Sequence, residues 1–336
     1  MLMNYYCYIF FIPMVVLTNM LMFILPSWFS MWMVMEINMI SFISLIIFDK
    51  NIKKESFMNY FLIQTINSYI FLMMSLMLEY NISNDIMFML MNFSMINKLG
   101  LPPFYFWYLK IMGNMNWINI FLMSTMQKII PMIIISNLLN YKFSVPFNLI
   151  IMLISSMYSS IKGLSQSNLK LIFCYSSIIQ ISWMIIMLIF SEMMSISYFI
   201  IYFIISLSLC LIFNNYNMNN MIDMQMMKFN NIITYYMMNF SIFSLASIPP
   251  FLGFMMKLIA IKELSNLLSM TTLIIMIISS LISMFFYLRM LFLNIMINAF
   301  SKKINYKFIN YNNFYNYKIM IMLWMMMVML MLMELI

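Results

Sequence analysis

Long apolar segments alternate with short polar ones along almost the whole chain. An α-helix needs about 20 apolar residues to cross the hydrocarbon core of a membrane, and the pattern predicts eleven helices of roughly this length. Their approximate bounds are 5–25, 27–48, 57–78, 86–109, 117–138, 144–161, 171–190, 195–213, 231–263, 270–297 and 317–335. The longest polar segment, 214–231, is predicted to be a connector.

The composition indicates a membrane environment throughout. Hydrophobic residues make up 65% of the 336 positions and charged residues only 8%, whereas charged residues make up about 25% of an ordinary soluble domain. We therefore predict an all-α polytopic membrane protein with a single transmembrane domain over residues 1–336. The net charge of +8 comes from scattered lysines rather than one basic patch, and so argues against a nucleic-acid partner.

The basic residues between the predicted spans are distributed unevenly. Eleven lysines fall on the side that holds the N-terminus, and only Lys142 and Lys262 fall on the other side. An excess of Lys and Arg marks the cytoplasmic side of a membrane protein, which corresponds to the matrix side in a mitochondrion. With eleven spans, the C-terminus lies on the opposite side.

Four ionisable residues are predicted to lie inside spans: Glu36, Lys98, Lys128 and Lys257. The first three are on the order of 15 Å from an interface at 1.5 Å per helical residue. Charged groups at such depth cost roughly 2.5–3.5 kcal/mol each and usually mark an ion or proton path. An inert ion pair between Glu36 and Lys98 is the alternative, although the lysines outnumber the carboxylate. Arg289 lies near a span end and is expected to be an interfacial anchor.

Two predicted spans contain helix breakers beside a lysine. Gly100, Pro102 and Pro103 follow Lys98, and Pro249, Pro250 and Gly253 precede Lys257. Broken helices are tolerated within a membrane only where the gap is packed in protein or faces water. The two spans are five apart and cross in opposite directions, which is typical of inverted repeats. We predict repeats over about 1–140 and 141–297 and a terminal helix at 317–335; ordinary proline kinks are the alternative.

Several other chemistries are unsupported by the sequence. Cys7, Cys174 and Cys210 lie in separate apolar segments without a C-x-x-C motif, so iron–sulfur or zinc ligation is not expected. The chain has no histidine, and its four glycines are too dispersed to form a phosphate-binding loop. We expect no metal, no cofactor-binding residues and no redox centre in this chain.

The residue usage suggests a mitochondrial genome. The counts of 50 Met, 32 Phe and 21 Tyr against 4 Gly and no His fit AT-rich codons and a code in which an additional codon specifies methionine. The N-terminal segment MLMNYYCYIF lacks the basic residues of a signal or transit peptide, so we expect the first span to be retained.

The motifs in and between the spans together resemble a known family. They include WMVMEINM from Trp32, NKLGLPPFYFW from Asn97, QKIIP from Gln127, GLSQSNLK from Gly163, YSSI from Tyr175 and PPFLGFMMK from Pro249. In this order they resemble NADH–ubiquinone oxidoreductase chain 2, an antiporter-like membrane subunit of respiratory complex I.

This resemblance implies proton translocation coupled to the oxidation of NADH by ubiquinone, in the mitochondrial inner membrane. It implies a charged axis made of Glu36, Lys98, Lys128 and Lys257. FMN, iron–sulfur clusters and quinone would be held by other subunits, and the expected partners are chains 4, 4L and 6, accessory subunits and membrane lipid.

The sequence departs from the family at two positions. Relatives often carry histidine where this chain has Tyr105 and Gln180. A proton relay here would therefore need lysines, Glu36, hydroxyls such as those of Ser124 and Thr125, and water. In this hypothesis Lys98, protonated when Glu36 is near, passes its proton to Lys128 and then toward Lys257. A structural scaffold between the quinone module and the distal pumps, and a free-standing cation/proton antiporter, are the alternatives.

Overall fold

The computed structural model describes residues 2–48, 54–78, 84–141, 143–226, 232–249, 251–265 and 269–300. These residues are helical apart from short connections, which confirms the predicted all-α fold for this part of the chain. Seven of the described helices, counting α6 and α7 together, are long and apolar enough to cross a membrane. The predicted span 317–335 lies outside the described residues.

The chain divides into two compact units, Met1–Ser155 and Ser156–Ile336. Their boundary falls within one helix, α8 (Ser144–Leu164). The first unit otherwise contains α1 (Leu2–Met22), α2 (Trp28–Ile47), α3 (Lys54–Leu78), α4 (Asn84–Leu99), α5 (Phe106–Asn114), α6 (Trp117–Ser124) and α7 (Met126–Leu138).

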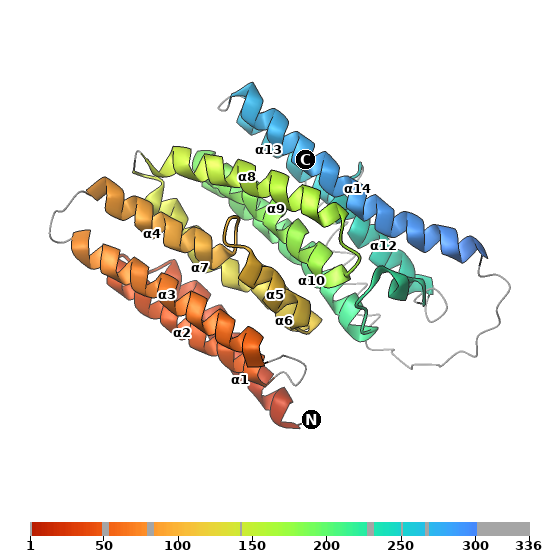
Figure 1. Ribbon diagram of the computed structural model, residues 1–336, viewed down its shortest axis with the longest axis horizontal. Helices are drawn as coiled ribbons and strands as arrows, with labels where there is room; N and C mark the ends of the chain where they lie inside the picture. The colour runs from red at the N-terminus through yellow and green to blue at the C-terminus, as the bar shows by residue number, and fades with distance from the viewer. Residues whose placement is uncertain are drawn as a thin grey trace. The chain divides into compact units, whose positions relative to one another are not determined.

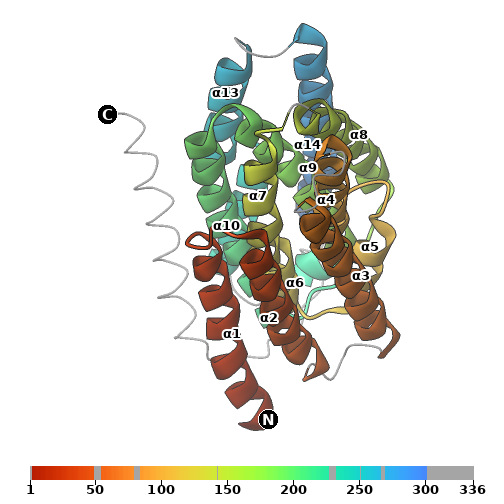
Figure 2. The same cartoon turned by 90° about the vertical axis from the view of Figure 1, so that its left-hand side faces the viewer.

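In the first unit, α2 packs between α1 and α3, and α3 packs against α4 (Figures 1 and 2). Helix α7 contacts both α1 and α4. Ser27 begins α2 as an N-cap, because its Oγ accepts a hydrogen bond from the Ser30 N–H at 3.3 Å. Successive contacts thus join α1, α2, α3, α4 and α7 in a closed ring.

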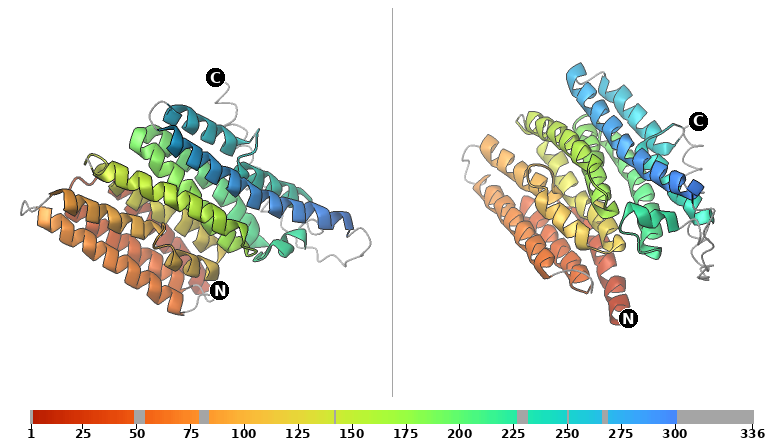
Figure 3. Two further views of the ribbon diagram at one scale, coloured as in Figure 1. Left: turned by 45° about the horizontal axis from the view of Figure 1, so that its top comes forward. Right: turned by 45° about the vertical axis from the view of Figure 1, so that its right-hand side comes forward.

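The second unit contains α9 (Leu169–Phe190), α10 (Glu192–Asn215), the 3₁₀ helix η1 (Met221–Met226), α12 (Ile232–Ala246), α13 (Leu252–Ser265) and α14 (Met270–Phe300). Helix α9 contacts α10, α13 and α14 and is buried on almost every face. The long helix α14, drawn in blue in Figure 3, also packs against α12. Arg289 on α14 donates hydrogen bonds to the carbonyls of Leu164 and Gln166 at the end of α8.

The surfaces of both units are unlike those of a soluble protein. Ile40, Ile66 and Phe285 are more than half exposed, while Asn92, Ser182 and Ser206 are fully buried. Apolar side chains that point outward and polar ones that point inward fit a solvent of lipid tails. The distribution therefore agrees with the apolar helices in assigning the chain to membranes.

The first predicted break separates α4 from α5. Gly100 has a φ of 72°, and its N–H donates to the Asn97 carbonyl while the Leu101 N–H donates to the Ile96 carbonyl. This pair of bonds is a Schellman motif, which satisfies carbonyls at a helix C-terminus. Glycine is favoured at such a position because it adopts positive φ without steric cost. Pro102 and Pro103 follow in the turn and cannot continue the helix.

The second predicted break, between α12 and α13, repeats the first. Ser247 has a φ of 57°, its N–H donates to the Ser244 carbonyl, and the Ile248 N–H donates to the Phe243 carbonyl. Pro249 stands in the turn, as Pro102 does at the first break, and Pro250 lies outside the described residues. Both breaks are therefore Schellman turns, one built on glycine and one on serine.

A further interruption was not predicted. The expected span 117–138 is divided at Thr125, whose φ of −122° and ψ of −74° lie outside the helical region. The Thr125 side chain donates to the Phe121 carbonyl at 2.7 Å, a local bond that competes with regular helical structure. Helix α7 starts again at Met126, two residues before Lys128.

Gly253 has a different role from the one predicted. It is the second residue of α13, and the left-handed residue at this break is Ser247. A Cβ at position 253 would lie 1.9 Å from the Ser244 carbonyl oxygen. Glycine is needed here because the start of α13 rests directly on the backbone at the end of α12.

Replacing Gly253 with alanine should therefore disrupt the second break. The clash is with backbone, which no rotamer change can relieve, and overpacking typically costs about 1–3 kcal/mol. We expect a lower thermal unfolding midpoint for Gly253→Ala in purified protein. Met255→Ala, at a position of α13 that is 40% exposed, is the control, and equal midpoints for Gly253→Ala and the unchanged protein would contradict this account of the close contact.

Candidate functional site

Glu36 and Lys98 lie on neighbouring sides of the first unit's core. Lys98 is in the last turn of α4, immediately before the Schellman turn, and is only 9% exposed. Its Nζ lies 3.5 Å from the Met35 Sδ on α2. Glu36 follows Met35 on α2 and interacts with Lys98 electrostatically. In the described part of the chain the two groups form no direct ion pair within 4.0 Å, so the charges are close but separated.

Two acceptor oxygens, one of them on Glu36 itself, are buried without a hydrogen-bond partner among the described residues. One is Oε1 of Glu36 and the other is Oδ1 of Asn97, the residue before Lys98. Asn97 uses its Nδ2 to donate to the Asn67 Oδ1 at 3.4 Å. Buried acceptors that lack a protein donor are normally satisfied by water. The surroundings of Lys98 are therefore suited to hydration.

Lys128 is held at the start of α7. It is 3% exposed, and its Nζ lies 4.7 Å from the centre of the Tyr108 ring on α5. Tyr108 also packs directly against the first break. A Cβ added to Gly100 would lie 2.8 Å from the Tyr108 Cβ. One aromatic side chain thus joins the broken helix to the buried lysine, and its π-face favours the charged ammonium.

Lys257 belongs to the second unit. It lies on α13, is 6% exposed, and its Nζ forms no ion pair with the described residues. The structure thus brings Glu36, Lys98 and Lys128 together around the first break, and it places Lys257 beside the second.

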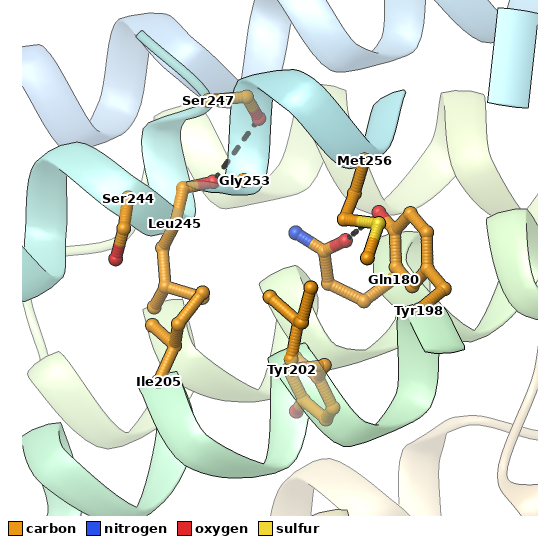
Figure 4. A pocket seen from close by; sticks show the side chains of 10 residues that line it. Gln180, Tyr198, Tyr202, Ile205, Ser244, Leu245, Ser247, Gly253 and Met256 are labelled. Atoms are coloured by element: carbon orange, nitrogen blue, oxygen red, sulfur yellow. Dashed lines mark hydrogen bonds between the residues drawn. The ribbon is translucent and has the colours of Figure 1, made fainter. Parts of the chain in front are cut away.

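A small cavity of about 20 Å³ lies at the second break (Figure 4). It is lined by side chains from α9, α10, α12 and α13, including Gln180, Tyr202 and Met256. The Tyr198 hydroxyl donates to the Gln180 Oε1. A cavity of this volume can hold one water molecule where polar groups such as the Gln180 amide line it. Gln180, at a position where histidine was expected from the resemblance, is therefore part of a neutral amide–phenol pair.

The expected hydroxyls are already engaged. Ser124 and Thr125 are both fully buried, and each donates to the Phe121 carbonyl, at 3.0 and 2.7 Å. In this arrangement neither proton is directed toward a lysine. Within the described residues no group of three or more His, Cys, Asp or Glu side chains comes together that could hold a metal.

Comparison with known proteins gives consistent results. The family model described as "NADH:quinone oxidoreductase/Mrp antiporter, TM" matches residues 26–286. NADH-ubiquinone oxidoreductase chain 2 of Anopheles gambiae is 32% identical over 81% of each chain. That of Rhipicephalus sanguineus is 35% identical over 79% of this chain and 82% of its own.

Solved structures share the fold. Respiratory complex I from Thermus thermophilus contains a chain that matches with a TM-score of 0.76 and 16% identity, covering 83% of this chain and 68% of that one. The Mrp complex from Dietzia gives a TM-score of 0.74 at 13% identity, covering 84% and 59%.

The fold and the buried lysines define an antiporter-like integral membrane protein. The matches in sequence are more specific, and the chain belongs to the NADH:quinone oxidoreductase/Mrp antiporter family and, within it, to the group of NADH-ubiquinone oxidoreductase chain 2.

The contact between Lys128 and Tyr108 can be tested by substitution. Tyr108→Leu removes the ring, and we expect it to lower the free energy of unfolding by about 2 kcal/mol beyond the loss of packing, because a desolvated cation–π contact is worth roughly that much. Tyr108→Phe keeps the ring and should lose much less. Thermal unfolding of the purified variants provides the comparison, and equal losses in the two variants would contradict a role for the ring.

Proposed function

We propose that this chain is a proton-translocating subunit of respiratory complex I in the mitochondrial inner membrane, where transport is coupled to the oxidation of NADH by ubiquinone. The relatives named NADH-ubiquinone oxidoreductase chain 2 support membership of this enzyme. FMN, iron–sulfur clusters and quinone are held by other subunits in this proposal. Chains 4, 4L and 6 and accessory subunits are the proposed partners in the membrane arm.

The observation that carries the proposal is the burial of three lysines beside helix breaks in a membrane protein. Lys98, Lys128 and Lys257 are each less than 10% exposed. Burying one such charge costs several kcal/mol unless it is paired or hydrated, and only Glu36 is available as a carboxylate within the proposed axis. An inert set of ion pairs would need equal numbers of both signs. Lysines that gain and lose protons do not need one carboxylate for each amine.

The proposed transfer starts at Lys98. Its ammonium lies at the C-terminus of α4, where the helix dipole favours a cation, and Glu36 adds a negative charge nearby. When the distance between Glu36 and Lys98 increases further, Lys98 releases its proton to water and becomes a neutral amine. The proton then reaches the neutral amine of Lys128, which becomes an ammonium above the Tyr108 ring, and it continues toward Lys257.

Eleven spans and two inverted repeats belong to this proposal. The two Schellman turns correspond residue by residue, from Gly100 and Ser247 to the Phe104 and Phe251 N–H groups, which donate to Leu101 and Ile248. In this correspondence Lys257 is the counterpart of Lys110. The Lys110 side chain is exposed, and its Nζ lies 4.0 Å from the Glu55 Oε2. Such a correspondence supports repeats over about 1–140 and 141–297.

Exchange of Lys98 for methionine tests the function. We expect protons pumped per NADH oxidised, measured with the assembled complex in sealed vesicles, to fall sharply, while assembly on native gels is unchanged. Lys110→Met, at the exposed counterpart of Lys257, is the matched control and should pump normally. Undiminished pumping by Lys98→Met would reject the relay and favour a scaffold. Transport of sodium by the chain purified alone would favour a cation/proton antiporter, whose fold it shares.

The proposed orientation has a separate test. The N-terminus is placed on the matrix side and the C-terminus on the intermembrane-space side, because lysines outside the spans concentrate on the N-terminal side. We expect a membrane-impermeant maleimide to label Asn140→Cys in intact mitoplasts. Ser165→Cys, also exposed, should be labelled only after the membrane is opened. The reverse order would invert the topology.

A further inference from the structure

A pair of side-chain amides joins α2 to the start of α7 in the first unit. Asn38 Nδ2 donates to the Gln127 Oε1 at 2.9 Å, and Gln127 Nε2 donates back to the Asn38 Oδ1 at 3.2 Å. The Thr18 hydroxyl of α1 lies 3.3 Å from the same Asn38 oxygen. Asn38 is 5% exposed and Thr18 is 2% exposed. The reciprocal bonds fix the orientation of both amides, because each acts as donor and as acceptor.

A second contact from α1 also holds the start of α7. Asn19 Nδ2 donates to the backbone carbonyl of Met126 at 3.1 Å. Met126 is the first residue of α7, directly after the irregular residue Thr125. The interruption at Thr125 leaves the start of α7 less constrained by the preceding helix. Side chains of α1 and α2 therefore fix the position of the turn that carries Lys128.

The amide pair also connects this turn to the charged pair at the first break. Asn38 lies two residues after Glu36 on α2, which places the two side chains about 200° apart around the helix. Met35, which contacts the Lys98 Nζ, lies between them. Helix α2 thus presents Glu36 toward Lys98 on one edge and Asn38 toward Gln127 on the other, and Gln127 is adjacent to Lys128 in sequence.

We propose that Asn38 and Gln127 are positioning residues that set the distance between the Glu36–Lys98 pair and Lys128, so that a shift of α2 is transmitted to Lys128. This inference rests on the proposed proton transfer. The proposal requires the Asn38 and Gln127 side chains together to span a fixed distance between α2 and α7. A general role in holding helices together would instead tolerate small changes in length as long as the fold survives.

The test exchanges the two amides. Gln127→Asn shortens one side chain by a carbon–carbon bond, about 1.5 Å, and Asn38→Gln lengthens the other by the same amount. The double variant restores the total length and both amides. A misplacement of about 1 Å can cost on the order of a hundredfold in a transfer step, so we expect each single variant to pump roughly tenfold less or worse. The double variant should recover most of the pumping.

The measurement is protons pumped per NADH oxidised by the assembled complex in sealed vesicles, recorded across pH, with assembly followed on native gels. Lys128→Met is the reference for the proposed function. Tyr216→Phe, which removes the contact of the Tyr216 hydroxyl with the Thr234 Oγ1 at 3.1 Å in the second unit, is the control for loss of a polar contact elsewhere.

Each outcome decides between the alternatives. Low pumping in both single variants and recovery in the double variant, with normal assembly, supports the proposal. Normal pumping in the single variants while Lys128→Met fails overturns the role of the pair and leaves the proposed function intact. Normal pumping by Lys128→Met would contradict the proposed function itself. Failure of the double variant to recover, or loss of assembly in the single variants, also overturns the proposal, since the pair then supports only the fold.

Discussion

Carbonyl groups at a buried helix C-terminus need hydrogen-bond donors from the protein, and the first unit of this protein depends on how the end of α4 meets this requirement. A Schellman turn at Gly100 closes the end of α4. The turn leaves Lys98 in the last helical turn, where the dipole stabilises a cation. It also directs the chain back so that Tyr108 lies against Gly100 and beneath Lys128. One backbone motif therefore positions two buried lysines.

The second unit uses the same motif under different constraints. Ser247 takes the left-handed position that glycine has in the first unit, and the start of α13 is pressed against the Ser244 carbonyl, where only Gly253 fits. Beside this turn the Gln180–Tyr198 pair and a cavity of about 20 Å³ provide neutral polar groups instead of an imidazole. The second unit therefore offers hydrogen-bonding groups, but Lys257 is its only titratable residue in the proposed axis.

The sequence was sufficient for the helical class and for the position of the two proline breaks, because apolar length and the missing proline N–H act locally. The three lysines that it predicts to lie inside spans are buried in the structure. The interruption at Thr125 could not be predicted, since it has no glycine or proline and its mark is a local bond from the Thr125 side chain to the Phe121 carbonyl. The partner of Gln127, Asn38, lies 89 residues away in the chain, so spacing along the chain gives no indication of this pair. The sequence predicts that Gly253 is part of the second break, whereas glycine is required there by the close approach of the Ser244 backbone.

The proposed proton transfer requires water at the lysines of the first break. The most direct measurement is a density map of the assembled complex that resolves ordered water in the first unit. This transfer predicts water molecules within hydrogen-bonding distance of the Lys98 Nζ and of the Glu36 and Asn97 oxygens that lack a described partner, continuing to Lys128. A first unit in which apolar side chains fill the space around both lysines and no water is bound would contradict it.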